Sequence, residues 1–219
     1  YYLNMETVFQ ALAEMKVPVI WTLHDCWSFT GHCAHYDSLN CDQWKSRCVR
    51  CPKLNTYPYQ WNGSHVSENF ELKKKLFHSL GNRLTLVAPS DWLKSQLEQS
   101  FLKDLDCRVI HNGIDLNTFH PVDSGFRKEH DLEGKRVYLA VASLWTKAKV
   151  NLEAQACGCG VVTYRTGGSP EMITEKTGAV VAKGNCQALL KAAGSLSVVR
   201  EDCIRHAQQF TKEKMLNQY

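Results

Sequence analysis

Apolar and polar residues recur along the chain with two different spacings. Between residues 3 and 16 the apolar residues return at intervals of three and four, which predicts a helix that ends at Pro18. The next run, VIWTL (19–23), is continuous and apolar, as in a buried strand. The same two patterns predict further helices at 66–80, 91–102, 151–157, 185–197 and 199–217 and further strands at 84–89, 107–113, 136–144, 161–165 and 179–182.

Strands that alternate with helices at this spacing predict an α/β fold with parallel sheets covered on both faces. Residues 25–64 form a long segment without either pattern, and residues 114–135 are rich in turn residues, as in a connector between domains. We therefore expect two domains, 1–118 and 119–219. In such folds ligands bind beyond the carboxyl ends of the strands.

Composition narrows the class of protein. Hydrophobic residues make up 44% and charged residues 22%, as in ordinary globular proteins, and no apolar run is long enough to span a membrane. The net charge of +4 permits contact with phosphate groups or an anionic membrane surface, but it is too scattered to favour nucleic acid. The first residues carry no signal-peptide pattern, and the chain begins within a structural pattern, as a piece of a longer chain would.

One short segment combines a carboxylate, small residues and a glycine pair. Glu153 falls in the first turn of the helix predicted at 151–157, and Gly167, Gly168 and Glu171 follow the strand at 161–165. A glycine pair there lets backbone N–H groups approach a ligand. The alternative is that Glu153 interacts only with its own helix dipole, that the glycines form a simple turn, and that Glu171 caps the helix after Pro170.

The irregular segment 25–64 contains a cysteine cluster. Cys33, Cys41, Cys48 and Cys51 lie close in sequence, and Cys48 and Cys51 have the spacing with which one turn presents two thiolates to a metal. A structural zinc would hold a loop of this length. The alternatives are free thiols, with the loop held by the aromatic residues 27, 29, 44 and 61, or disulfides.

Several stretches resemble a known family. The segment NLEAQACGCGVVTYRTGGSPEMI (151–173) is similar to the nucleotide-sugar site of the retaining glycosyltransferases of family 4, which have the GT-B fold. The stretches VIHNGIDLNTFHP (109–121) and VASLWTKAK (141–149) look like the end of the first and the start of the second domain of that family. VIWTLHDCWSFTGHC (19–33) and PSDWL (89–93) resemble a bacterial subgroup of the colanic-acid type, which builds surface polysaccharides.

The resemblance implies an enzyme with two Rossmann-like domains that moves a sugar from a nucleoside-diphosphate sugar to a glycan or lipid-linked acceptor. Glu153 would bind the ribose, Lys149 the diphosphate, and Gly167, Gly168 and Glu171 the rest of the donor. His24 would lie near the transferred sugar. The alternative is that His24 has only a structural role, as a histidine at a strand end whose hydrogen bonds are made within the protein. No metal is implied in the chemistry and no nucleic acid as partner, and the protein would be cytoplasmic, in peripheral contact with the inner face of the membrane.

The sequence also departs from the family. Lys149 is followed at once by the helix that carries Glu153, where the family has several more strands and helices. Trp145 stands where the family's first glutamate is expected, and the glycine-rich loop of the first domain is missing. Both domains are therefore expected to be incomplete, through omission or natural loss. The competing functions are an inactive remnant of such an enzyme and a zinc-stabilised interaction module.

Overall fold

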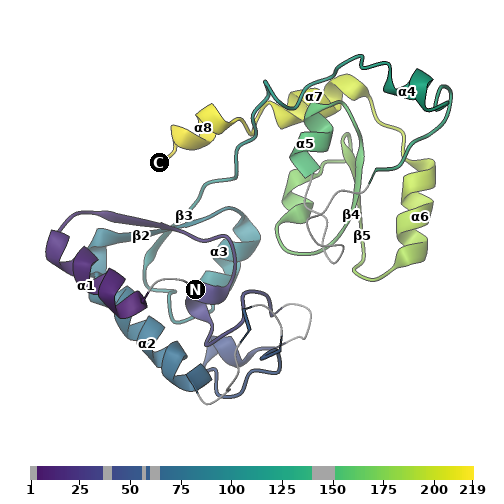
Figure 1. The fold of residues 1–219 in the computed structure, drawn as a ribbon. Helices are drawn as coiled ribbons and strands as arrows, with labels where there is room; N and C mark the ends of the chain where they lie inside the picture. Colours follow the sequence, from purple (N-terminus) through teal and green to yellow (C-terminus); the bar gives the residue numbers. More distant parts are fainter. Residues whose placement is uncertain (1–3, 37–40, 56–57, 60–64, 140–150) are drawn as a thin grey trace. The chain divides into compact units, whose positions relative to one another are not determined.

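The computed structural model describes residues 4–36, 41–55, 58–59, 65–139 and 151–219. The chain divides into two compact units, Tyr1–Ile110 and His111–Tyr219 (Figure 1). The division falls before the predicted boundary at 118, because Ile114 packs with Leu152 and Ala207 of the second unit.

The first unit begins with helix α1 and strand β1. Asn4 caps α1 by accepting a hydrogen bond from the backbone N–H of Thr7 at 3.0 Å, and the helix ends at Lys16, which has a left-handed φ of 54°. The regular elements of this unit are α1 (Met5–Met15), β1 (Val19–Thr22), η1 (Trp27–Phe29), η2 (Gln43–Lys45), α2 (Val66–Ser79), η4 (Gly81–Arg83), β2 (Leu84–Ala88), α3 (Asp91–Leu97) and β3 (Asp106–Val109).

The three strands of the first unit form a parallel sheet in the order β1-β2-β3. Val19 pairs with Leu84 and Thr85 with Asp106, so all three strands run toward the same edge. The central strand β2 is the most apolar, and four of its five residues are buried, as a strand covered on both faces requires. The predicted α/β class therefore holds in this unit, and the carboxyl ends of the strands lie at one edge.

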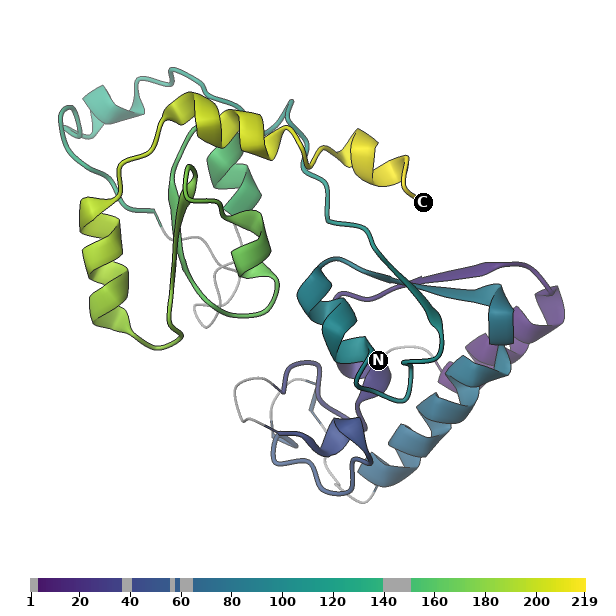
Figure 2. The same cartoon turned by 180° about the vertical axis from the view of Figure 1, so that it is seen from behind.

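Aromatic side chains from α1, β1 and α2 make the centre of the first core. Phe9 lies with its ring centroid 5.0 Å from that of Phe77 and 5.5 Å from that of Trp21. Figures 1 and 2 show α1 and α2 side by side along the sheet. This arrangement explains the helical spacing of apolar residues in both segments, because each helix turns one apolar stripe toward the sheet.

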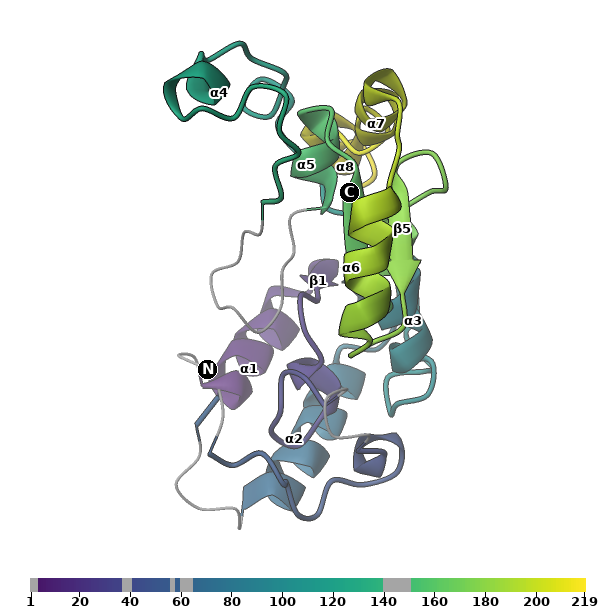
Figure 3. The same cartoon turned by 90° about the vertical axis from the view of Figure 1, so that its right-hand side faces the viewer.

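The second unit contains a smaller parallel pair, β4-β5, with Val161 opposite Gly178. Figures 1 and 2 show α5 and α6 on opposite sides of this pair, and Figure 3 shows α6 running along β5. The second core is built around Ile114, Leu152, Ala156 and Ala207. The elements of this unit are α4 (Phe126–Glu129), α5 (Asn151–Ala156), β4 (Val161–Tyr164), η5 (Ser169–Met172), β5 (Gly178–Val181), α6 (Cys186–Ser195), α7 (Arg200–Ala207) and α8 (Lys212–Leu216).

Three predictions for the second unit need correction. Residues 136–139 are not part of a strand, and the rest of the strand predicted at 136–144 lies outside the described residues. The expected connector contains the short helix α4. The single helix predicted at 199–217 is two helices, because the chain between them leaves helical geometry to pair with Ile114.

Candidate functional site

His24 lies at the carboxyl edge of the first sheet. The backbone N–H of Leu23 still bonds to the carbonyl of Val87 at 2.8 Å, and His24 follows directly with an exposed side chain. The carboxylate of Asp25 accepts a hydrogen bond from the backbone N–H of Trp27 at 2.8 Å, which shapes the turn after His24. The structure thus puts His24 where ligands of parallel sheets bind.

A buried lysine that sequence reasoning missed holds this turn in place. The amino group of Lys73, in α2, donates to the carbonyls of Trp27 at 2.7 Å and Thr30 at 2.9 Å, and lies 3.5 Å from the centroid of a ring of Trp27. Lys73 is only 4% exposed, and burial lowers its pKa to about 7, while Asp25 acts in the opposite direction. The loop after His24 is therefore fixed by a side chain from a distant helix.

The four cysteines predicted as metal ligands line one small cavity. Its volume is about 10 Å³, and His32 and Trp44 line it as well. Burial raises the pKa of Cys33 to about 12, with further increases from the neighbouring thiols, and burial raises that of Cys48 to about 11. All four are free thiols, so the disulfide alternative is wrong for this structure.

The thiols share a cavity without reaching the geometry of a bound metal. A tetrahedral zinc site with Zn–S bonds of about 2.3 Å places its sulfur atoms about 3.8 Å apart. Among the described residues, no three of these cysteines bring their sulfur atoms within 4.8 Å of one another.

The loop that carries the four cysteines is packed by aromatic rings, as one alternative predicted. Trp44 is buried, stacks on Tyr36 at 4.6 Å between ring centroids, and meets Phe29 edge-on at 5.4 Å. The packing alternative therefore holds for Phe29 and Trp44, whereas Trp61 lies outside the described residues.

In the second unit the structure brings the predicted donor-binding segments together. Glu153 lies in the first turn of α5, and its side chain is half-buried. Gly167 follows β4 with a left-handed φ of 52°, a conformation that favours glycine, and Gly168 precedes η5. Glu171 lies in the first turn of η5, which begins at Ser169 and includes Pro170, whereas the helix was expected after Pro170. One hydrogen bond, from the side chain of Gln155 to the carbonyl of Met172 at 2.8 Å, joins α5 to η5.

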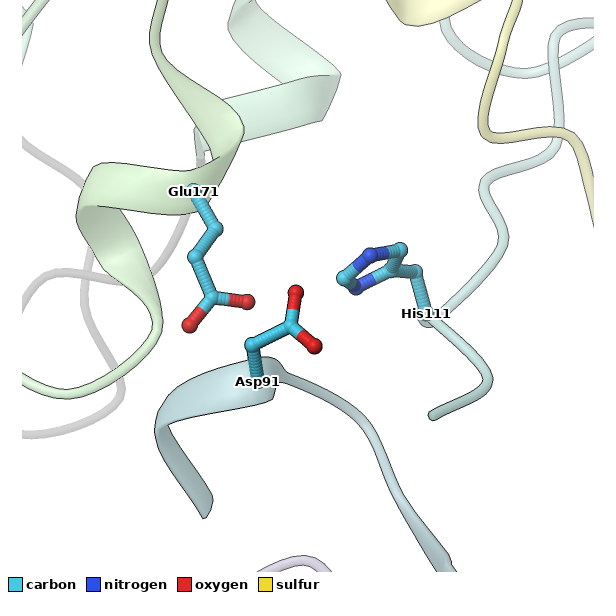
Figure 4. Close-up of side chains that lie close together, drawn as sticks. All are labelled: Asp91, His111 and Glu171. Carbon is cyan, nitrogen blue, oxygen red and sulfur yellow. The ribbon is translucent and has the colours of Figure 1, made fainter. Parts of the chain in front are cut away.

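Lys149, with its junction to Val150, lies outside the described residues. Figure 4 draws the side chain of Glu171 together with those of His111 and Asp91. Asp91 belongs to the first unit and the other two to the second, so the three side chains do not make up a metal site of either unit.

The fold is similar to that of a solved structure. Sucrose-phosphate synthase from Thermosynechococcus elongatus matches 100% of this chain and 70% of its own, with a TM-score of 0.59 and 14% sequence identity. At this identity the likeness speaks for the fold alone. It confirms the predicted fold class, an α/β structure with parallel sheets of the GT-B type.

Sequence similarity then points to a particular relative. The chain is 35% identical over 127 residues to WcaC of Escherichia coli (strain K12), which is named as a glycosyl transferase of colanic acid biosynthesis. The match covers 54% of this chain, and the chain spans only 30% of that relative's length. No protein-family model matches the chain. The resemblance to surface-polysaccharide glycosyltransferases that the motifs indicated is thus confirmed by a named relative.

Proposed function

We propose that the protein transfers a sugar from a nucleoside-diphosphate sugar to a glycan or lipid-linked acceptor, with retention at the anomeric carbon. The observation that carries this proposal is the arrangement of α5 and η5 in the second unit. A half-buried carboxylate lies in the first turn of α5, and a glycine pair lies between β4 and η5. The hydrogen bond from Gln155 to the carbonyl of Met172 joins the two helices. The similarity to WcaC supports a polysaccharide as the product.

The proposed roles follow from the chemistry of each group. The carboxylate of Glu153 accepts hydrogen bonds from the two ribose hydroxyls, and Lys149 neutralises charge that grows on the leaving diphosphate. Gly167 and Gly168 leave backbone N–H groups open to the donor, and Glu171 faces the donor from η5. His24 binds a hydroxyl of the transferred sugar or a phosphate. No metal ion takes part in this chemistry.

Calorimetric titration with UDP-sugars and GDP-sugars tests the function. We expect Glu153→Gln to weaken donor binding by about 1–3 kcal/mol, because a charged acceptor is lost from a hydrogen-bonded site. Glu175→Gln, which changes an exposed glutamate of the same unit, is the matched control and should bind like the wild type. A folded wild-type protein that binds no nucleotide sugar would instead favour the inactive remnant.

We also propose that the enzyme is cytoplasmic and meets its acceptor at the inner membrane surface. Among the described residues no helix has both the length and the apolar character needed to cross a bilayer. The net charge of +4 favours contact with anionic lipid. Sedimentation with anionic vesicles, lost at high salt and absent with neutral vesicles, is the expected result. Equal sedimentation with both kinds of vesicle, or with neither, contradicts peripheral electrostatic contact.

For the first unit we propose a structural zinc held by Cys33, Cys41, Cys48 and Cys51. Its support is that four thiols from one irregular loop line a single cavity of about 10 Å³. Binding requires rotation of the side chains toward the metal and loss of the thiol protons, so affinity should rise with pH. The zinc would stabilise the loop beside His24 and take no part in the reaction.

Metal analysis of the reduced, zinc-supplemented protein tests this site. We expect one equivalent of zinc in the wild type, and its loss together with a lower melting temperature in Cys48→Ser/Cys51→Ser. The matched control is Cys159→Ser/Cys186→Ser, which changes two exposed cysteines of the second unit and should retain the metal. A wild-type protein without stoichiometric metal would overturn the proposal.

A further inference from the structure

Gln155 is a fully buried polar side chain two positions after Glu153. Its exposure is 0%, and it lies on the face of α5 that packs against α7 and η5. Its amide nitrogen lies 2.8 Å from the carbonyl oxygen of Met172, and its amide oxygen lies 2.7 Å from Nδ1 of His206. One side chain thus connects α5, η5 and α7.

The direction of both hydrogen bonds is fixed by the groups involved. The carbonyl of Met172 can only accept, so the amide nitrogen of Gln155 must face it. The amide oxygen then faces His206, whose Nδ1 must carry a proton and donate. Burial lowers the pKa of His206, which favours the neutral ring with its single proton on Nδ1. His206 therefore holds the amide of Gln155 in the orientation that binds η5.

Stability alone does not explain a glutamine at this position. A buried amide has to regain in the protein the hydrogen bonds that it loses from water, and an apolar side chain of similar size would fill the same space without that cost. An apolar side chain, however, cannot make the directional hydrogen bonds that orient one backbone segment relative to another. Gln155 fixes the carbonyl of Met172, at the end of η5, relative to the first turn of α5, and thereby sets how Glu171 and Gly168 lie relative to Glu153.

We propose that Gln155 and His206 are positioning residues of the nucleotide-sugar site, which hold η5 and the glycine pair against the helix that carries Glu153. This inference rests on the proposed function for its ligand, but the connection itself is a property of the free protein. Neither residue touches the donor in this scheme. Both act by keeping the two donor-binding segments at a fixed separation before the donor arrives.

The test compares four variants of the full chain. Gln155→Met keeps the size of the side chain and removes both hydrogen bonds. His206→Leu removes only the hydrogen bond between His206 and Gln155 and leaves the one to Met172. His206→Asn keeps an N–H donor near the position of Nδ1. Gln209→Met changes an exposed glutamine near the end of α7 and is the matched control. Each variant is measured by hydrogen exchange of residues 167–173 without ligand and by calorimetric titration with the nucleotide sugar that binds the wild type.

We expect Gln155→Met to speed exchange in residues 167–173 and to weaken donor binding about tenfold, the equivalent of one hydrogen bond. His206→Leu should show a smaller change in the same direction, and His206→Asn and Gln209→Met should resemble the wild type. The conservative variant separates positioning from packing, because a purely structural role would not distinguish His206→Asn from His206→Leu.

Two results overturn the inference. One is unchanged exchange and unchanged donor binding in a folded Gln155→Met protein. The other, which applies if that variant does not fold, is a His206→Leu protein that equals the wild type in both measurements. A wild-type protein that binds no nucleotide sugar refutes the proposed function, and the exchange of residues 167–173 then still decides whether Gln155 and His206 hold η5 in place.

Discussion

Lys73 brings an amino group into the interior of the first unit, and its protonation should govern stability. Its pKa falls from 10.5 to about 7 on folding, so between these values the unfolded chain binds more protons than the folded one. The free energy of unfolding contributed by this group should therefore rise as the pH rises from about 7 toward 10.5, and fall as the pH is lowered again. Denaturant titrations of the wild type and Lys73→Met between pH 6.5 and about 9.5 measure the difference.

The control for this effect is Lys74→Met, which changes an exposed lysine in the next position of α2. The difference in unfolding free energy between the wild type and Lys73→Met should grow with pH, and the difference for Lys74→Met should stay flat. A flat difference for Lys73→Met would show that the two carbonyl hydrogen bonds keep its pKa near the ordinary value of lysine.

Residues were predictable where the signal is local. Glu153, Gly167 and Gly168 could be found because a first helical turn and a glycine pair after a strand are both visible in a few neighbouring residues. Lys73 and Gln155 could not, because their partners lie 17 to 51 residues away in sequence. From the sequence alone, a lysine or glutamine in an amphipathic helix is expected to be exposed to solvent. Only the fold shows that a carbonyl group lies beside it in the interior.

Elements followed the pattern well where apolar spacing and a capping residue agree. Helix α3 starts after Ser90, as predicted, and the side-chain oxygen of Ser90 accepts a hydrogen bond from the backbone N–H of Leu93 at 3.2 Å. At the break between α7 and α8 the only local signal is Thr211, whose side-chain oxygen caps α8 by accepting a hydrogen bond from the backbone N–H of Lys214 at 3.2 Å, while the apolar spacing runs on. The break arises because the N–H of Ile114 bonds to the carbonyl of Phe210 at 2.9 Å, a partner far away in sequence.

The cap of α3 provides a test at this scale. Ser90→Ala should lower the free energy of unfolding by about 1 kcal/mol, because the N–H of Leu93 loses its acceptor in a buried setting. Ser90→Thr retains a hydroxyl and should lose only part of this stability. Urea titration compares the three proteins, and equal stability of Ser90→Ala and the wild type would contradict the capping role.

The pairing of β4 with β5 depends on a glycine. A Cβ atom at Gly178 would collide with the backbone carbonyl of Val161 in the opposite strand, so Gly178→Ala should destabilise the second unit. Gly194, inside α6, has open space around it, and Gly194→Ala should raise the free energy of unfolding by about 0.5–1 kcal/mol. Thermal unfolding of the two variants should therefore shift in opposite directions, and shifts of the same sign would refute the pairing described here.

On the scale of the whole molecule, the two units differ in how much core supports them. Among the residues that the structure describes, nineteen buried residues make the core of the first unit, including Phe9, Phe29, Trp44, Phe70 and Phe77, whereas four make that of the second. The sequence predicted two incomplete parallel α/β units and only about three strands in the second, which is few for a stable parallel sheet, but it did not predict how many residues each core buries. A ligand should consequently contribute a larger share of the stability of the second unit, whose described residues form the smaller core.

Nucleotide binding should therefore protect the two units unequally. Most of the proposed contacts of a nucleoside diphosphate, Glu153, Lys149 and the glycine pair, belong to the second unit, and only His24, which is proposed to bind the transferred sugar or a phosphate, belongs to the first. The nucleotide without its sugar should therefore stabilise chiefly the second unit. At 100 times its dissociation constant it would add about 2.7 kcal/mol to the stability of the unit that binds it. Hydrogen exchange of the full chain with and without UDP or GDP should show slower exchange in α5, β4 and β5 and no change in β1, β2 and β3. Glu153→Gln should reduce that protection at the same nucleotide concentration. Protection confined to the first unit, or equal in both, would mean that the nucleotide binds elsewhere than at Glu153 and the glycine pair.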